Sequence, residues 1–283
     1  MPVPTRRDSA LRRAAEAGER LRSCDLCGHR CGVDRLAGAL GPCHAGPEGR
    51  VFHGQVEVGD EAFLTPVFAL ALSGCDFRCD FCNTGRESWD ASAGRTVDTA
   101  FLESLGARLR RGAAEGEFRS VMILGGEPTV HLPTALRLRA EIPEEVAAVW
   151  KTNAHSTPEA EALLDGLFDV WVADLKFGND ACALRIARVA DYTVRVRGTL
   201  RRIAARTRLV VRHLLMPGHL DCCWRPTAEW LASELPGVEV SLRGGFWPGW
   251  FSHRHPELRR TVRATEEAEA RRIGEALGLR LIP

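Results

Sequence analysis

Short β-prone apolar runs alternate with amphipathic segments along the chain from about residue 64. The apolar runs lie at 67–72, 120–124, 146–150, 169–173, 209–215 and 238–242. The amphipathic segments lie at 99–111, 158–164, 226–235 and 265–277. Alternation of strands and helices at this spacing predicts βαβ units and a parallel sheet. Six units suit part of a barrel better than a closed eightfold one, so we expect an α/β fold with a partial (β/α)6 barrel over residues 61–283.

The first 60 residues follow a different pattern. Residues 1–20 are rich in Arg, Ala and Glu, which predicts a helix or an arm. Residues 21–60 are rich in Cys, Gly, His and Pro and have no apolar periodicity. A segment of this composition cannot build a core of its own, so we expect a small irregular segment that a metal holds together.

Composition limits the classes of partner. The chain is 45% apolar with a formal net charge of +1, which gives no support to a nucleic-acid-binding surface. The longest apolar run, at 67–72, is too short to span a membrane. The charged start of the chain has no apolar region typical of a secretory signal. We therefore expect a cytoplasmic protein that binds neither nucleic acid nor membrane.

Cysteine placement indicates metal binding. Seven of the ten cysteines fall between Cys24 and Cys82, and in a long cytoplasmic chain clustered thiols favour metal sites over disulfides. Cys75, Cys79 and Cys82 have the spacing C-x3-C-x2-C directly after the first predicted strand. Three thiolates can hold three irons of a [4Fe–4S] cluster and leave the fourth iron open. The alternative is a zinc knuckle that takes a fourth ligand such as His53.

Further polar residues follow the other predicted strands. In parallel α/β folds, functional residues collect where the strands end. Of the 38 basic residues only two are lysines, and both lie at such ends. The residues that we single out at these positions are Gly125, Gly126, Glu127, Lys151, Thr152, Asn153, Asp174, Lys176 and Arg212.

These motifs resemble those of a known family. The three-cysteine loop, with Phe81 before its last cysteine, is similar to the motif of the radical S-adenosylmethionine (SAM) superfamily. The run from Gly125 to Pro128 resembles the superfamily's motif for the methionine part of SAM. From about Cys24 to its C-terminus the chain resembles homologues of the pyruvate formate-lyase activating enzyme.

The resemblance implies a mechanism and partners. The open iron would bind the amino and carboxylate groups of SAM, and one electron would cleave SAM to a 5′-deoxyadenosyl radical that abstracts hydrogen from a substrate. Phe81, Gly125, Gly126 and Glu127 would contact SAM. A flavodoxin or ferredoxin would donate the electron. We favour a small-molecule or peptide substrate (tailoring or epimerisation) over a glycyl-radical-enzyme activase. A zinc-ribbon binding protein without catalysis is a remote alternative.

The chain departs from its relatives at Lys151. In the activating enzymes, an acidic residue followed by Thr-Asn helps to hold a monovalent cation beside the SAM carboxylate, and here Lys151 precedes Thr152 and Asn153. The lysine would replace the charge of that cation; alternatively it extends to solvent. The resemblance also places Asp174 and Lys176 around SAM. Arg212 is a candidate for bidentate contact with the carboxylate, or it forms a surface ion pair.

A second cysteine set lies in the N-terminal segment. Cys24, Cys27, Cys31 and Cys43 provide four thiolates, which suits either zinc or a fully ligated [4Fe–4S] cluster; we favour the auxiliary cluster. The remaining cysteines, Cys182, Cys222 and Cys223, have no metal-binding spacing, and we interpret them as buried or incidental thiols.

Overall fold

The computed structural model describes residues 4–59 and 61–283, and residues 1–3 of the predicted N-terminal arm lie outside that range. The chain forms two compact units. The first unit holds the residues up to Asp76 together with Arg86–Thr152 and Ser156–Trp171. The second unit holds Phe77–Gly85, Asn153–His155 and Val172–Pro283.

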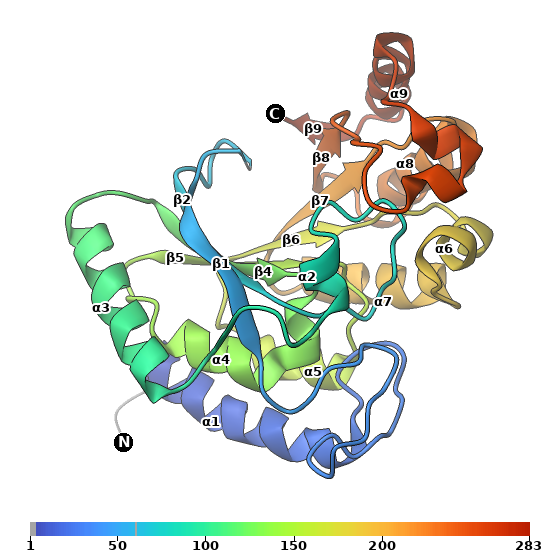
Figure 1. The fold of residues 1–283 in the computed structure, drawn as a ribbon. Helices are drawn as coiled ribbons and strands as arrows, with labels where there is room; N and C mark the ends of the chain where they lie inside the picture. Colours follow the sequence, from blue (N-terminus) through green and yellow to red (C-terminus); the bar gives the residue numbers. More distant parts are fainter. Residues whose placement is uncertain (1–3, 60) are drawn as a thin grey trace. The chain divides into compact units, whose positions relative to one another are not determined.

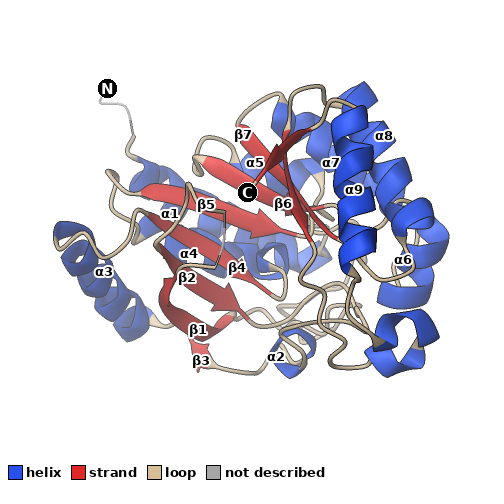
Figure 2. Ribbon diagram, turned by 90° about the horizontal axis from the view of Figure 1, so that it is seen from above, coloured by secondary structure: helices blue, strands red, loops and turns tan. Residues whose placement is uncertain are grey.

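The first unit is built on five strands in the order β3-β1-β2-β4-β5 (Figure 2). Their bounds are β1 Arg50–Glu57, β2 Val67–Leu72, β3 Arg95–Thr96, β4 Ser120–Gly125 and β5 Ala147–Thr152. All six residues of β2 are buried. This agrees with its position between antiparallel β1 and parallel β4, because a central strand is covered on both faces.

Helices pack on this sheet and on one another. Their bounds are α1 Arg6–Glu19, α2 Arg86–Trp89, α3 Thr99–Ala114, α4 Leu132–Ala140 and α5 Pro158–Leu164. The short 3₁₀ helices η1 Arg20–Ser23 and η2 Pro128–His131 adjoin α1 and α4. The Thr5 hydroxyl accepts the Asp8 amide at 3.1 Å and begins α1. The buried face of α1 consists of alanines, and this small face lies along α4 (Figure 1).

The second unit contains three parallel strands in the order β7-β8-β9. These strands are β7 Arg208–Leu214, β8 Glu239–Arg243 and β9 Arg280–Ile282, while β6 Val170–Asp174 crosses from the first unit into the second. The α-helices are α6 Asp180–Ala187, α7 Tyr192–Ala204, α8 Arg225–Glu234 and α9 Ala264–Ala276. A π-helix, η3 Leu220–Trp224, leads into α8, and η4 Ser252–Arg254 and η5 Pro256–Arg259 follow β8.

The predicted alternation of parallel strands and helices is confirmed. All six predicted strands and all four predicted helices are present, with ends within three residues of the predicted ones. The segment 21–60 is irregular only in part, because β1 lies inside it. The alternation in β1 is weak: only Val51 of its eight residues is buried. The helices α4, α6 and α7 were not predicted. In the described ranges, no helix is both long and apolar enough to cross a membrane.

Candidate active site and cysteine clusters

The glycine pair after β4 packs directly against the start of the cysteine loop in the first unit. The Gly126 amide donates to Leu72 O at 2.9 Å, and the Glu127 amide donates to Gly74 O at 2.9 Å. A Cβ atom on Gly125 would lie 2.1 Å from Leu72 O, and one on Gly126 would lie 2.1 Å from Gly74 O. Only glycine permits this approach. The Gly-Gly-Glu-Pro turn and the chain that leads into Cys75 therefore form one tight assembly.

The Glu127 side chain is buried and held by two threonines. Its Oε1 accepts hydrogen bonds from the Thr129 amide at 3.0 Å, from Thr129 Oγ1 at 2.6 Å and from Thr152 Oγ1 at 2.8 Å. Three hydrogen bonds to one oxygen fix the orientation of this side chain. The structure thus brings together two of the sequence-predicted residues, Glu127 and Thr152, from the ends of neighbouring strands.

The middle of the cysteine loop lies in the second unit and depends on Asp80. This carboxylate is 1% exposed. It accepts hydrogen bonds from Arg188 Nη2 at 3.0 Å, Arg254 Nη1 at 3.1 Å and His255 Nε2 at 2.8 Å. Two guanidinium groups and an imidazole N–H compensate for the desolvation of the charge. Because Asp80 directly follows Cys79, these bonds set the position of the loop.

Backbone contacts attach the same loop to α6 and to the segment after β8. The amides of Arg78 and Asp80 donate to the carbonyls of Ala187 and Ile186, both at 3.0 Å. The Phe251 amide donates to Asp80 O at 2.8 Å. The predicted residue Phe81 is buried, and its ring lies 6.2 Å from that of Phe177 and 6.0 Å from that of Phe246. Cys79 is buried and Cys82 is half-buried.

The loop after β6 orients the second lysine. Lys176 forms an ion pair with Asp174, and both side chains are about one-fifth exposed, at 19% and 22%. The hydroxyl of Tyr192 accepts the Lys176 amide at 2.6 Å. Tyr192 is fully buried, and this burial raises the pKa of its hydroxyl, so the group stays protonated. The lone tyrosine of the chain thus holds the backbone of a predicted site residue.

The ends of β6 and β7 are joined beside this lysine. The Leu175 amide donates to Arg212 O at 2.9 Å, and His213 Nδ1 donates to Leu175 O at 2.6 Å. Burial lowers the pKa of His213 to about 4, so its ring is neutral at pH 7. Arg212 is half-buried on β7.

The remaining predicted residues lie where the chain passes between the units. Lys151 and Thr152 end β5 in the first unit, and Lys151 is half-buried. Asn153 begins the next stretch in the second unit, where its Oδ1 accepts the His155 amide at 2.9 Å. The chain also passes between the units after Asp76, inside the cysteine loop. The residues predicted to bind SAM are therefore divided between the two units.

The N-terminal cysteine quartet lies in the first unit, where a buried arginine contacts Cys24. Cys24, Cys27 and Cys43 are buried and Cys31 is half-buried. Arg35 is 1% exposed. Its guanidinium donates to Val130 O at 2.6 Å and to Gly46 O, and it lies 3.8 Å from the sulfur of Cys24.

Burial and nearby charges raise the pKa of two thiols of the quartet, Cys27 and Cys43. Burial raises the pKa of the Cys27 thiol, and the nearby Asp76 carboxylate raises it further. Burial also raises the pKa of Cys43, which Arg35 partly offsets. His131 lies next to Arg35, and burial followed by that positive charge lowers the pKa of His131 to about 3. A metal would therefore displace protons from Cys27 and Cys43 on binding.

Comparison with known proteins places this chain in a family. The model of the family described as the radical SAM superfamily matches residues 71–231, more than half of the chain. The chain belongs to this superfamily and is an enzyme of it. The family implies SAM and a [4Fe–4S] cluster as cofactors, and its enzymes need a reductant and a substrate. The uncharacterized protein MJ0674 of Methanocaldococcus jannaschii is 28% identical over 267 residues, which cover 92% of this chain and 77% of that protein.

Solved structures show the same fold. SuiB of Streptococcus suis bound to the precursor peptide SuiA has a TM-score of 0.53 at 15% identity, over 73% of this chain and 46% of that chain. A radical SAM methyltransferase from Sphaerobacter thermophilus has a TM-score of 0.52 at 16% identity, over 75% of this chain and 65% of that chain. This chain thus spans about half the length of SuiB. The predicted α/β class with a partial radical SAM barrel is confirmed.

Several residues of functional interest were not found from the sequence. Asp80 is visible only as one of three charged residues in the cysteine loop, with Asp76 and Arg78, and Arg35 only as one arginine among many. Cys182 and Cys223 are buried, as predicted, but their proximity was not predicted: the three remaining cysteines lie together with His219, all four ligand atoms within 4.8 Å of one another. Spacing along the sequence could not reveal this group, because 40 residues separate Cys182 from Cys222.

We expect Gly126→Ala to destabilise the protein by about 1–3 kcal/mol, the usual cost of forced overpacking. Its new methyl group would meet a backbone oxygen that cannot move without displacing the cysteine loop. Urea unfolding measures the change. The matched control is Gly18→Ala in α1, where a Cβ meets nothing within 4 Å and helix propensity favours alanine by up to about 1 kcal/mol. Equal stability of Gly126→Ala and wild type would contradict the contact.

Proposed function

We propose that this radical SAM enzyme cleaves SAM reductively at Cys75, Cys79 and Cys82 and uses the resulting radical on a small-molecule or peptide substrate. The observation that carries the proposal is the backbone contact between the glycine pair and the chain leading into Cys75. It supports a binding site for SAM beside a cluster, since these two motifs must act on one ligand. A bound [4Fe–4S] cluster with SAM supplies a 5′-deoxyadenosyl radical that abstracts hydrogen.

The donor set fits a cluster with one open iron. Three cysteines in one short loop provide three thiolates, and Cys75 and Cys79 are buried away from water. The hydrogen bonds of Asp80 hold the loop before a cofactor binds, so less ordering is needed on binding. We infer that Gly125 and Gly126 let the backbone approach the amino group of SAM, and that Glu127 accepts a hydrogen bond from that group.

The two lysines complete the proposed SAM contacts. Lys151 and Lys176 are the only lysines among 38 basic residues, and each lies at the end of a strand, on or just after β5 and β6. A compact ammonium acts as a point charge, which a planar guanidinium does not replace. We infer that Lys151 takes the place of a monovalent cation beside the SAM carboxylate. Asn153, Asp174 and Arg212 are the further residues proposed to surround SAM.

The quartet of Cys24, Cys27, Cys31 and Cys43 is proposed to hold an auxiliary [4Fe–4S] cluster. Four thiolates complete the ligand set of such a cluster, in which each cysteine binds a different iron.

Arg35 supports an anionic metal centre at the quartet. In the described part of the chain no carboxylate forms an ion pair with Arg35, although its side chain is buried. A buried guanidinium is costly without a counter-charge. Four thiolates around a [4Fe–4S] cluster of charge +2 carry a net charge of −2, which would supply that counter-charge.

The substrate class is inferred from the auxiliary site and from the fold relatives. SuiB has this fold and is bound to a precursor peptide in its structure. The presence of a quartet favours a small-molecule or peptide substrate over the activation of a glycyl-radical enzyme. A flavodoxin or ferredoxin is proposed as the electron donor.

Cys79→Ala should abolish the production of 5′-deoxyadenosine by the anaerobic, dithionite-reduced protein, because two thiolates cannot hold the open cluster. The reaction is measured by chromatography after addition of SAM. The control is Asn83→Ala, which changes an exposed side chain just past the same loop and should retain cleavage. Full 5′-deoxyadenosine formation by the Cys79→Ala protein would refute the assignment.

Cys24→Ala combined with Cys27→Ala should lower the iron content from about eight to about four atoms per chain, since each cubane holds four irons. The N-terminal segment should also become sensitive to limited proteolysis, because it has few apolar residues to replace the metal. Metal analysis of anaerobically purified protein measures the first effect. Loss of one zinc with iron unchanged would show that the quartet binds zinc and not an auxiliary cluster. No loss of metal would refute both the cluster and the zinc site.

A further inference from the structure

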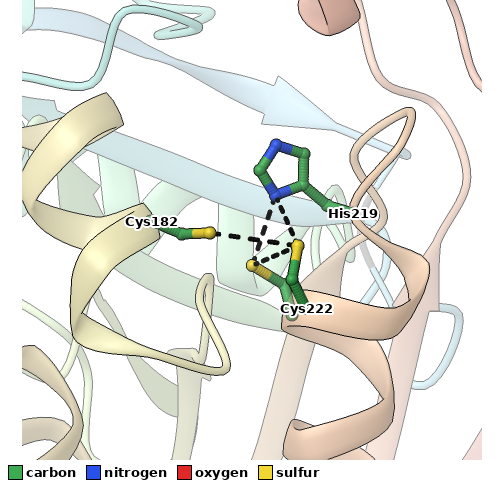
Figure 3. A group of neighbouring side chains, drawn as sticks. Cys182, His219 and Cys222 are labelled. Carbon is green, nitrogen blue, oxygen red and sulfur yellow. Dashed lines mark hydrogen bonds between the residues drawn. The ribbon is translucent and has the colours of Figure 1, made fainter.

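Three cysteines and a histidine converge in the second unit, outside the two sites described above. Cys182 Sγ lies 3.9 Å from Cys222 Sγ, and Cys222 Sγ lies 3.9 Å from Cys223 Sγ. His219 Nδ1 lies 3.3 Å from Cys222 Sγ and 3.4 Å from Cys223 Sγ. Figure 3 shows the ring of His219 with this nitrogen directed at the sulfurs. Three of the four residues are buried and Cys222 is half-buried.

We propose that Cys182, His219, Cys222 and Cys223 form a mononuclear structural zinc site. Zinc binds sulfur at about 2.3 Å and imidazole nitrogen at about 2.0–2.1 Å in a tetrahedron. Two such sulfurs are then about 3.8 Å apart, and a sulfur and a nitrogen about 3.5 Å apart. The measured separations of 3.9, 3.9, 3.3 and 3.4 Å match these edges.

The same distances argue against the two alternatives for clustered thiols, a disulfide and an iron–sulfur cubane. A disulfide needs sulfurs about 2.05 Å apart, and the separations of 3.9 Å are nearly twice that. In a cubane each cysteine binds a separate iron, so the thiolates surround a larger object. Here all four ligand atoms lie within 4.8 Å of one another, and one ion can bind them all.

The fold builds this group with two unusual local features. Cys222 and Cys223 lie on the π-helix η3, a rare helix type that occurs often at functional sites. Gly178 lies against the backbone of Cys223, where a Cβ would be 2.3 Å from the Cys223 carbonyl oxygen. The side chain of Asn179 joins the two parts: its Nδ2 donates to Cys222 O at 2.6 Å and to Cys182 Sγ at 3.4 Å.

The surroundings of His219 are those of a metal-binding histidine. Its Nδ1 faces the thiols, while its Nε2 lies 3.5 Å from Glu257 Oε1. A carboxylate on the second ring nitrogen fixes the tautomer and orientation of metal-bound histidines. Glu257 is itself held by Arg185, whose Nη1 lies 2.7 Å from Glu257 Oε1.

The arginine extends this arrangement to the cysteine loop. Arg185 Nη1 donates to His255 Nδ1 at 3.0 Å, and His255 Nε2 donates to Asp80 Oδ2 at 2.8 Å. A continuous series of polar contacts therefore runs from His219 to the carboxylate between Cys79 and Phe81. Four protein ligands leave zinc no open position, which is typical of structural sites. The zinc would join the segments after β6 and β7 and support the loop through Glu257 and Arg185.

Metal analysis of the full-length protein tests the site. Wild type grown with zinc and purified anaerobically should hold one zinc per chain more than either His219→Ala or Cys222→Ser, with iron unchanged in both variants. His219→Cys should retain the zinc, because four cysteines are also a complete ligand set. The control is His253→Ala, an exposed histidine of η4 that should lose nothing. Unchanged iron separates this result from a failure of the proposed SAM site or quartet.

A second measurement does not depend on the folding of a variant. X-ray absorption at the zinc edge of the wild type should show sulfur ligands at about 2.3 Å and an imidazole nitrogen at about 2.0–2.1 Å. A zinc spectrum without an imidazole ligand would overturn the proposal. So would iron in place of zinc at this group, a disulfide among these cysteines in unreduced protein, or equal zinc in wild type and His219→Ala.

Discussion

The burial of Asp80 is the constraint on which the arrangement of the second unit depends. A carboxylate with 1% of its surface exposed is unstable without compensating charge. Arg188, at the end of α6, and Arg254, after β8, supply it, and His255 adds a hydrogen bond. These elements must lie against the cysteine loop for the charge to be neutralised. The position of the loop therefore depends on the folding of the rest of the unit. Removing the carboxylate would leave the guanidinium groups of Arg188 and Arg254 without their shared partner, although solvent reaches both, since their side chains are 43% and 44% exposed.

The cysteines of this chain are grouped outside the apolar strands that form the core. The ten cysteines divide into the loop of three, the quartet of four and the group of three with His219. The first two sets lie in irregular chain, and the third lies on α6 and η3, so none of them lies within the apolar strands. The backbone near the sets is held by close glycine contacts at Gly126 and Gly178. Regular secondary structure thus provides the frame, while polar and proposed metal contacts fix the segments that carry the chemistry.

Local sequence was enough to predict most of the strands, several of the helices and the principal motifs. It was not enough to predict contacts between residues that are distant along the chain. The strands were found because each is a short apolar run, and Cys75, Cys79 and Cys82 because they lie in one loop. By contrast, β1 has one fully buried residue, so its alternation is weak. The group around His219 joins residues 40 positions apart, and only the packing of α6 against η3 brings them together. Asp80 could not be recognised either, since its partners come from two later segments, the end of α6 and the segment after β8.

The central claim is that Cys75, Cys79 and Cys82 hold a cluster with one iron open to SAM. Electron paramagnetic resonance on the anaerobically reduced protein tests it most directly, with spectra recorded before and after SAM is added. The account predicts that SAM changes the signal of one cluster, because it binds the open iron, and leaves the signal of the fully ligated quartet unchanged. It also predicts that the change is absent from Cys75→Ala. A spectrum of the wild type that SAM does not alter, in protein with a full complement of iron, would contradict the account.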